Sequence, residues 1–157
     1  MVFRENYPMM IIAILATLFY SSGSVAKDDN DSVMVFVSFS MPDASIQQWL
    51  DAAHRYHASV LIRGLVNNSF RNTTAKVLSL VKDTEGQKAK TGVSLDPVAF
   101  QKYNINRVPA VVVTHGDAFD VIYGEVSLRF ALNKIADRDD SVSFVARHAL
   151  QESTGHA

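Results

Sequence analysis

A proline stands directly before a run of β-branched and small apolar residues, in the stretch NINRVPAVVV at residues 104–113. Because proline has no amide proton to donate, a sheet accepts it only at the first residue of a strand, at an edge or at a bulge. The run Ala110–Thr114 has the continuous hydrophobicity of a strand buried on both faces. The sequence therefore predicts a buried strand that begins immediately after Pro109.

Two further buried strands enclose a helix in the first half of the chain. The runs Ser32–Phe39 and Ser59–Gly64 are rich in β-branched and apolar residues. Between them apolar residues recur at helical spacing: Ile46, Trp49, Leu50 and Ala53. Ser40 is the predicted N-cap of this helix, which is expected to end near His57. A strand, a helix and a second buried strand predict a right-handed parallel crossover.

A helix, a short edge strand and a short helix are predicted next. The helix carries its apolar face at four positions: Phe70, Val77, Leu78 and Val81. The short edge strand lies in VSLDP at 93–97, where Asp96 before a proline is typical of the N-cap of the following helix. Arg63 ends the second strand and needs a partner, for which Asp96 or a carboxylate of the first helix is predicted.

The last third of the chain is predicted to form a hairpin and one or two helices. After the proline strand, Asp120–Gly124 is expected to return as an antiparallel strand. A helix follows, with apolar residues at i, i+3, i+4 and i+7: Leu128, Ala131, Leu132 and Ile135. Ser141–Gln151 is a candidate for a further helix. This order of elements predicts one α/β domain with a mixed sheet.

The N-terminus has the layout of a secretory signal. Arg4 precedes an apolar run at 9–20, and the small residues around Ala26 form a cleavage site before a polar stretch. The alternative, a membrane anchor, needs roughly 20 apolar residues, which is more than this run provides. We predict a signal peptide at 1–26, a polar linker at 27–32, a folded domain at 33–137 and a C-terminal tail at 138–157. The mature chain is then exported and free of the membrane.

Composition and motifs argue against several classes of function. The net charge of −1 offers no basic face for nucleic acid, and the absence of cysteine excludes thiol chemistry by the chain itself. His54 and His57 lack a third metal ligand nearby, and a nucleophilic Ser40 would need an adjacent base. No phosphate-binding loop or nucleophile elbow is present. We therefore expect a protein that is not an enzyme, with no cofactor, no metal and no small-molecule substrate.

The element order and the segment around Val108-Pro109 resemble the thioredoxin fold. In that family a helix and a short loop lead into a cis-proline, which opens a buried strand followed by a hairpin and a last amphipathic helix. The resemblance implies a thioredoxin-like fold with a central mixed sheet and a helical insertion after the second strand. Pro109 is the cis-proline candidate. FSMPDA at 39–44 stands where the family keeps its Cys-x-x-Cys, and neither cysteine is present.

Four segments are similar to a narrower family, the TrbC pilin assembly proteins of F-type conjugative transfer systems. They are VFVSFSMPDASIQQWL, VLIRGLVNNSFRNT, SLDPVAFQKYNINRVPAVVV and YGEVSL, and the resemblance spans 33–135. It implies a periplasmic role in assembling the conjugative pilus of a type IV secretion system. It also implies a protein partner, the family's usual partner TraW.

We place the partner-binding site at the loops that a thiol enzyme of this fold would use. An extended partner segment can pair with the backbone before the proline, as in β-augmentation. The hypothesis assigns this groove to six residues: Ser40, Met41, Pro42, Arg107, Val108 and Pro109. The exposed face of the insertion that follows Asn67–Phe70 is the second candidate surface.

The expected function is thus that of a non-catalytic assembly factor that acts through protein contacts. Two alternatives stay open at this point. One is a redox or isomerase component that depends on a partner's cysteines, and the other is a general periplasmic chaperone.

Overall fold

The computed structural model of the chain describes residues 31–82 and 92–154. The predicted signal peptide at 1–26 and most of the predicted linker at 27–32 lie outside these ranges. The polar connection at 83–91 and the last three residues lie outside them too. Among the described residues, no helix combines the length and the hydrophobicity that crossing a membrane requires.

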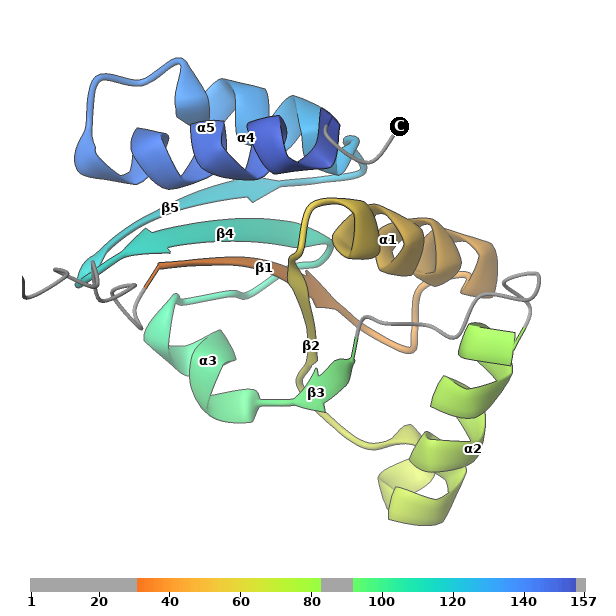
Figure 1. The fold of residues 1–157 in the computed structure, drawn as a ribbon. Coiled ribbons are helices and arrows are strands. Elements are labelled where there is room, and N and C mark those ends of the chain that lie inside the picture. The colour runs from red at the N-terminus through yellow and green to blue at the C-terminus, as the bar shows by residue number, and fades with distance from the viewer. Residues whose placement is uncertain (1–30, 83–91, 155–157) are drawn as a thin grey trace, which may run out of the picture.

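A five-stranded mixed sheet forms the centre of the molecule (Figure 1). Its strands in spatial order are β3 (Val93–Leu95), β2 (Ser59–Ile62), β1 (Ser32–Val37), β4 (Ala110–His115) and β5 (Ala118–Tyr123). β1, β2 and β3 run parallel to one another, whereas β4 is antiparallel to both β1 and β5. The carboxyl ends of β1, β2, β3 and β5 therefore meet the start of β4 at one edge of the sheet.

The interior strands β1 and β4 are buried because helices cover both faces of the sheet. Val35 and Val111 belong to the larger core on one face, while Phe36 and Val112 belong to the smaller core on the other. Each of these four side chains is at most 1% exposed. This confirms the sequence-based prediction of continuous strands buried on both faces, which β-branched residues favour.

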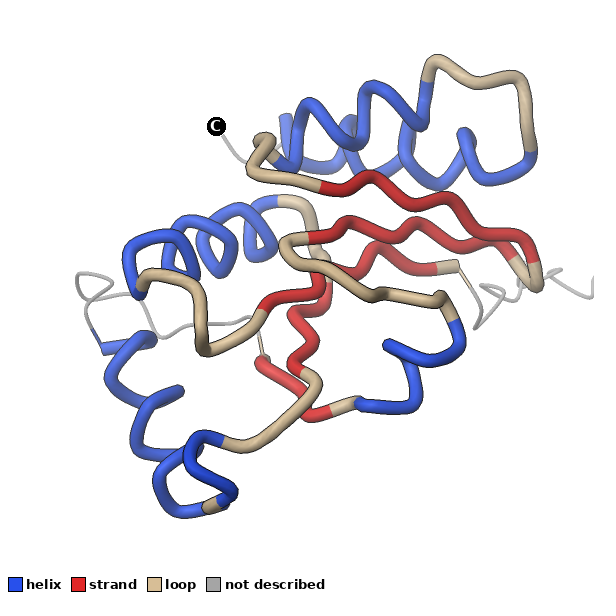
Figure 2. Tube along the Cα trace, turned by 180° about the vertical axis from the view of Figure 1, so that it is seen from behind, coloured by secondary structure: helices blue, strands red, loops and turns tan. Residues whose placement is uncertain are grey.

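The larger core is covered by α1 (Asp43–Arg55), α4 (Leu128–Ala136) and α5 (Ser141–Thr154). The smaller core is covered by α3 (Pro97–Lys102), which lies across the sheet from the other three helices (Figure 2). There the Phe36 and Phe100 rings meet edge to face with their centroids 4.8 Å apart. Asp96 caps α3 by accepting a hydrogen bond from the Ala99 amide at 2.9 Å, which confirms the predicted N-cap.

This arrangement is a thioredoxin-like fold, as the sequence predicts. The β1–α1–β2 crossover, the strand β4 that opens after Pro109, the β4–β5 hairpin and the final packing of α4 follow the expected order. The 3₁₀ turn η1 (Val66–Asn68) and α2 (Phe70–Lys82) form the helical insertion after β2. The chain has no Cys-x-x-Cys because it has no cysteine.

The predicted apolar face of α2 is not the face that packs. Phe70 is 73% exposed and Leu78 is 50% exposed, whereas Thr73 and Leu80 are buried. The helix touches the rest of the fold mainly through α1, and Lys76 forms an ion pair there with Asp43. A helix that packs along only one side buries only the residues on that side. Apolar residues elsewhere on its surface stay exposed.

The C-terminal region forms a helix, and that helix belongs to the main core. α5 extends the predicted Ser141–Gln151 helix by one turn. Its buried apolar residues join the larger core together with β1 and β4: Val142, Val145, Ala146 and Ala149. The strand predicted at Asp120–Gly124 begins two residues earlier, at Ala118.

Candidate functional site

The loops that carry the six predicted groove residues lie at the same edge of the sheet. Phe36 pairs with Ala110 in the antiparallel β1–β4 ladder. One and two residues further along, the ladder places Pro109 and Val108 beside the residues that leave β1. The first loop, 38–42, and the second loop, 107–109, are therefore neighbours, although about 70 positions separate them in the sequence.

The first loop is a tight turn that precedes α1. The Met41 amide donates to the Ser38 carbonyl at 3.0 Å, and the hydroxyls of Ser38 and Ser40 lie 2.9 Å apart. Ser40 is therefore not the N-cap predicted from the sequence. The helix begins at Asp43 with Pro42 at the cap position and no side-chain cap, because local bonds to Ser38 hold the Ser40 hydroxyl and amide.

Met41 and Pro42 present different surfaces. The Met41 side chain is half-buried and packs against the larger core beside Phe39. Pro42 and Ser40 are exposed. The loop thus presents one flexible apolar side chain, Met41, which packs partly on the core and lies between the exposed residues Ser40 and Pro42.

In the second loop the Val108–Pro109 peptide bond is cis. Pro109 is buried, and its carbonyl accepts a hydrogen bond from the Gly124 amide at 3.0 Å. No described residue makes a hydrogen bond with the amide or the carbonyl of Val108. Val108 is half-buried and lies two positions before β4, and neither of its backbone groups is engaged by a described residue.

Arg107 and Met41 lie toward opposite faces of the sheet. Its guanidinium stacks over the Tyr123 ring at 4.7 Å from the centroid, and Tyr123 packs on the α3 side. The Tyr123 hydroxyl donates to the Asn104 carbonyl at 3.2 Å. The structure therefore brings Val108 and Pro109 next to the first loop and sets the Arg107 charge at the rim.

A third segment completes this edge of the molecule. The loop between β5 and α4 is tied to α1, because the Ser45 hydroxyl donates to Glu125 Oε1 at 3.0 Å. The same loop is tied to the second loop through the Gly124–Pro109 bond. These bonds hold the loops on both sides of Val108 in one arrangement.

A hollow of about 420 Å³ borders the first loop on the β2 side. Its apolar lining comes from four side chains: Phe39, Ile62, Leu65 and Val66. Ser38, Ser40 and Asn67 add polar groups. Sequence reasoning did not find this hollow. The sequence signal that could have indicated it is the apolar pair Leu65 and Val66, which follows Gly64 after the β2 run.

Arg63, at the end of β2, does not pair with a carboxylate as predicted. Its guanidinium donates to the Ile105 carbonyl at 2.7 Å and lies 5.1 Å from the centroid of the Phe100 ring. Asp96 is engaged in capping α3. A backbone carbonyl and an aromatic face satisfy the cation here, and neither can be identified from sequence spacing.

The geometry contains no catalytic arrangement among the described residues. The partner of the Ser40 hydroxyl is Ser38, which is not a base. No group of three metal-ligating side chains occurs in the described ranges. His57 follows the end of α1 with φ of 52°, so it does not share a helix face with His54. What this edge offers is backbone and apolar surface, which are the means of polypeptide recognition.

Comparison with known proteins identifies the family. The profile of TrbC_Ftype, described as type-F conjugative transfer system pilin assembly protein, matches residues 35–135. The chain belongs to this family. The matched region of this TrbC-family chain contains both loops of the candidate site, and α5 lies beyond it.

A curated relative is the periplasmic protein TrbC of Escherichia coli K12. It is 38% identical over 107 residues, which are 68% of this chain and 49% of the relative. The chain therefore spans about half the length of that relative.

Two solved structures also match. StoA from Bacillus subtilis has a TM-score of 0.45 at 13% identity, over 66% of this chain and 80% of StoA. MTB DsbF has a TM-score of 0.44 at 11% identity, over 76% of this chain and 81% of DsbF.

Proposed function

We propose that this chain is a non-catalytic assembly factor for the F-type conjugative pilus and acts by binding another protein. Membership in a family of pilin assembly proteins supports a role in pilus assembly. The absence of cysteine supports a role without thiol chemistry. The predicted signal peptide and the name of the E. coli relative support a periplasmic location.

The observation that carries the binding role is that the backbone of Val108, beside the first loop, has no hydrogen-bond partner in the described part of the chain. An extended segment that runs past this residue gains two main-chain hydrogen bonds without displacing any bond between described residues. Met41 supplies an apolar contact on one side and Arg107 supplies a charge at the rim. Ser40 and Pro42 border this groove. The proposed partner is a TraW-like protein of the same conjugation system.

Copurification of the full chain with its TraW-like protein tests the proposal. The variants are Met41→Asp, which places a charge where the apolar contact is expected, and Arg107→Ala, which removes the rim cation. We expect Met41→Asp to weaken binding by about tenfold, or about 1.4 kcal/mol, and Arg107→Ala to weaken it by less.

Matched controls separate binding from folding. Gln48→Asp adds the same charge to an exposed position of α1, and Arg71→Ala removes an exposed cation from α2. Both controls are expected to bind like the unmodified chain, and thermal unfolding checks that all variants are folded. Because Arg107 is exposed, its replacement does not threaten the fold. Unchanged affinity in both groove variants would rule the groove out.

A further inference from the structure

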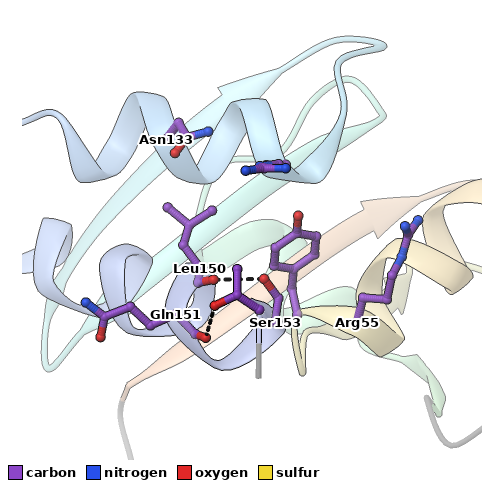
Figure 3. A pocket seen from close by; sticks show the side chains of 8 residues that line it. Arg55, Asn133, Leu150, Gln151 and Ser153 are labelled. Carbon is purple, nitrogen blue, oxygen red and sulfur yellow. Dashed lines mark hydrogen bonds between the residues drawn. The ribbon is translucent and has the colours of Figure 1, made fainter. Parts of the chain in front are cut away.

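A second hollow lies where α1, α4 and α5 meet, and the groove proposal does not involve it. Its volume is about 580 Å³. Arg55 and Tyr56 line it from the end of α1, Arg129 and Asn133 from α4, and Leu150 from α5. Figure 3 shows Leu150 pointing from α5 toward α4, with Arg55 on the α1 side.

Among the described residues that line the hollow, two carry guanidinium groups and none is acidic. Arg129 has no hydrogen-bond or ion-pair partner among the described residues, and Arg55 donates to the Asp51 carbonyl of its own helix at 3.4 Å. Two arginines elsewhere are engaged: Arg138 pairs with Asp120, and Arg147 donates to the Ala136 carbonyl. No carboxylate of the described residues therefore pairs with the two guanidiniums at the hollow.

Helix stability does not explain Arg129. This residue lies in the first turn of α4, directly after the cap Ser127 and Leu128. A cation is disfavoured there, because the unpaired backbone amides carry partial positive charge. Arg55, by contrast, lies in the last turn of α1, where a cation is favourable. The position of Arg129 is best accounted for by an anion outside the helix.

The remaining lining suits a peptide better than a single ion. The Leu150 side chain and the Tyr56 ring pack against the larger core and give the hollow an apolar floor. The amides of Asn133 and Gln151 add donors and acceptors at its wall. The volume lies within the range of roughly 300–1,000 Å³ that is typical of ligand sites. Two guanidiniums beside an apolar surface match carboxylates next to an apolar side chain.

We propose that this hollow binds an acidic peptide segment of a partner protein. One or two carboxylates of the segment accept hydrogen bonds from Arg55 and Arg129, and a neighbouring apolar side chain rests on Leu150. The site is distinct from the groove, because the two lie at opposite ends of α1. A helix of 13 residues separates them by about 18 Å.

NMR titration of the full chain tests this site directly. The probe is a short synthetic peptide with two glutamates flanking a leucine, and its matched control has glutamine in place of each glutamate. We expect saturable shifts of the Asn133 and Gln151 side-chain amides with the acidic peptide. Affinity is expected to fall by about tenfold with the glutamine peptide and with either Arg55→Glu or Arg129→Glu.

Three controls decide between the outcomes. Arg71→Glu reverses an exposed charge on α2 and is expected to bind the acidic peptide normally. The groove variant Met41→Asp is also expected to bind it normally, so failure of one proposal is distinguishable from failure of the other. Inorganic phosphate that produces the same shifts with equal affinity would overturn a peptide site in favour of a simple anion site. Absence of saturable shifts would overturn the proposal altogether.

Discussion

At the scale of single residues, the Thr73 hydroxyl makes two hydrogen bonds within the helical insertion that follows β2. Thr73 is buried on α2, accepts a hydrogen bond from the Val66 amide and donates one to the Ser69 carbonyl, each at 2.8 Å. Between these partners, Asn67 and Asn68 adopt left-handed φ angles of 50° and 55°, which asparagine tolerates better than most residues. The Thr73 side chain thus links the loop after β2 to the start of α2.

Replacing Thr73 by valine tests this link. Thr73→Val keeps the shape but leaves the partly buried Val66 amide without its acceptor, so we expect a loss of about 1–2 kcal/mol in the free energy of unfolding. Thr73→Ser keeps the hydroxyl and is expected to lose less. Urea unfolding measures both variants. A Thr73→Val variant as stable as the unmodified chain would show that these hydrogen bonds do not contribute to stability.

At the scale of elements, α5 is a structural part of the domain although the family match ends before it. The helix buries Val142, Val145 and Ala146 against the larger core, while Phe144 on its outer side is 60% exposed. Arg147 joins α5 to α4 by donating to the Ala136 carbonyl at 2.7 Å. Removing α5 would therefore expose Val111 and Val113 of β4, which share the larger core with this helix.

Two aspartate substitutions on α5, one at a buried and one at an exposed position, test whether this helix is part of the core. Ala146 is fully buried, so Ala146→Asp is expected to destabilise the chain by about 3–5 kcal/mol through an unpaired buried charge. Phe144→Asp introduces the same group at an exposed position and is expected to have little effect. Thermal and urea unfolding compare the two. Similar stability of both variants would contradict the inclusion of α5 in the core.

At the scale of the whole molecule, a thioredoxin-like fold is present without the residues that give such a fold its thiol chemistry. Fold alone does not imply function, because activity depends on the groups at the site. The chain has no cysteine, and Met41 and Pro42 stand between Ser40 of the first loop and Asp43, the first residue of α1. What the fold keeps at this edge is a set of loops in a defined arrangement, which suits binding.

The consequence is an expected absence of activity in insulin reduction. The full chain is expected to give no precipitation of insulin above the background with dithiothreitol alone, because no thiol is available to attack a disulfide. A thioredoxin serves as the positive control. The assay is repeated with the TraW-like partner present. Activity of the mixture above that of the partner alone would support the redox alternative and contradict the non-catalytic proposal.

Much of the fold follows from local patterns in the sequence. β1 and β4 are runs of β-branched residues, and Leu128, Ala131, Leu132 and Ile135 fall on the buried face of α4 as their spacing predicts. The resemblance to the thioredoxin fold, not a local pattern, placed the candidate groove at Pro109 and at the segment after β1. Whether this groove binds the partner is a question for the copurification experiment.

Other features depend on neighbours that no local pattern specifies. The exposure of Phe70, the pairing of Arg63 with a carbonyl and a ring, and the two hollows arise from contacts between distant segments. The sequence by itself determined the strands, the order of elements and the lack of thiol chemistry, because periodicity and residue type are local properties. Only the tertiary structure decided which helix faces pack and which charges stay unpaired, because burial is set by what lies opposite in space.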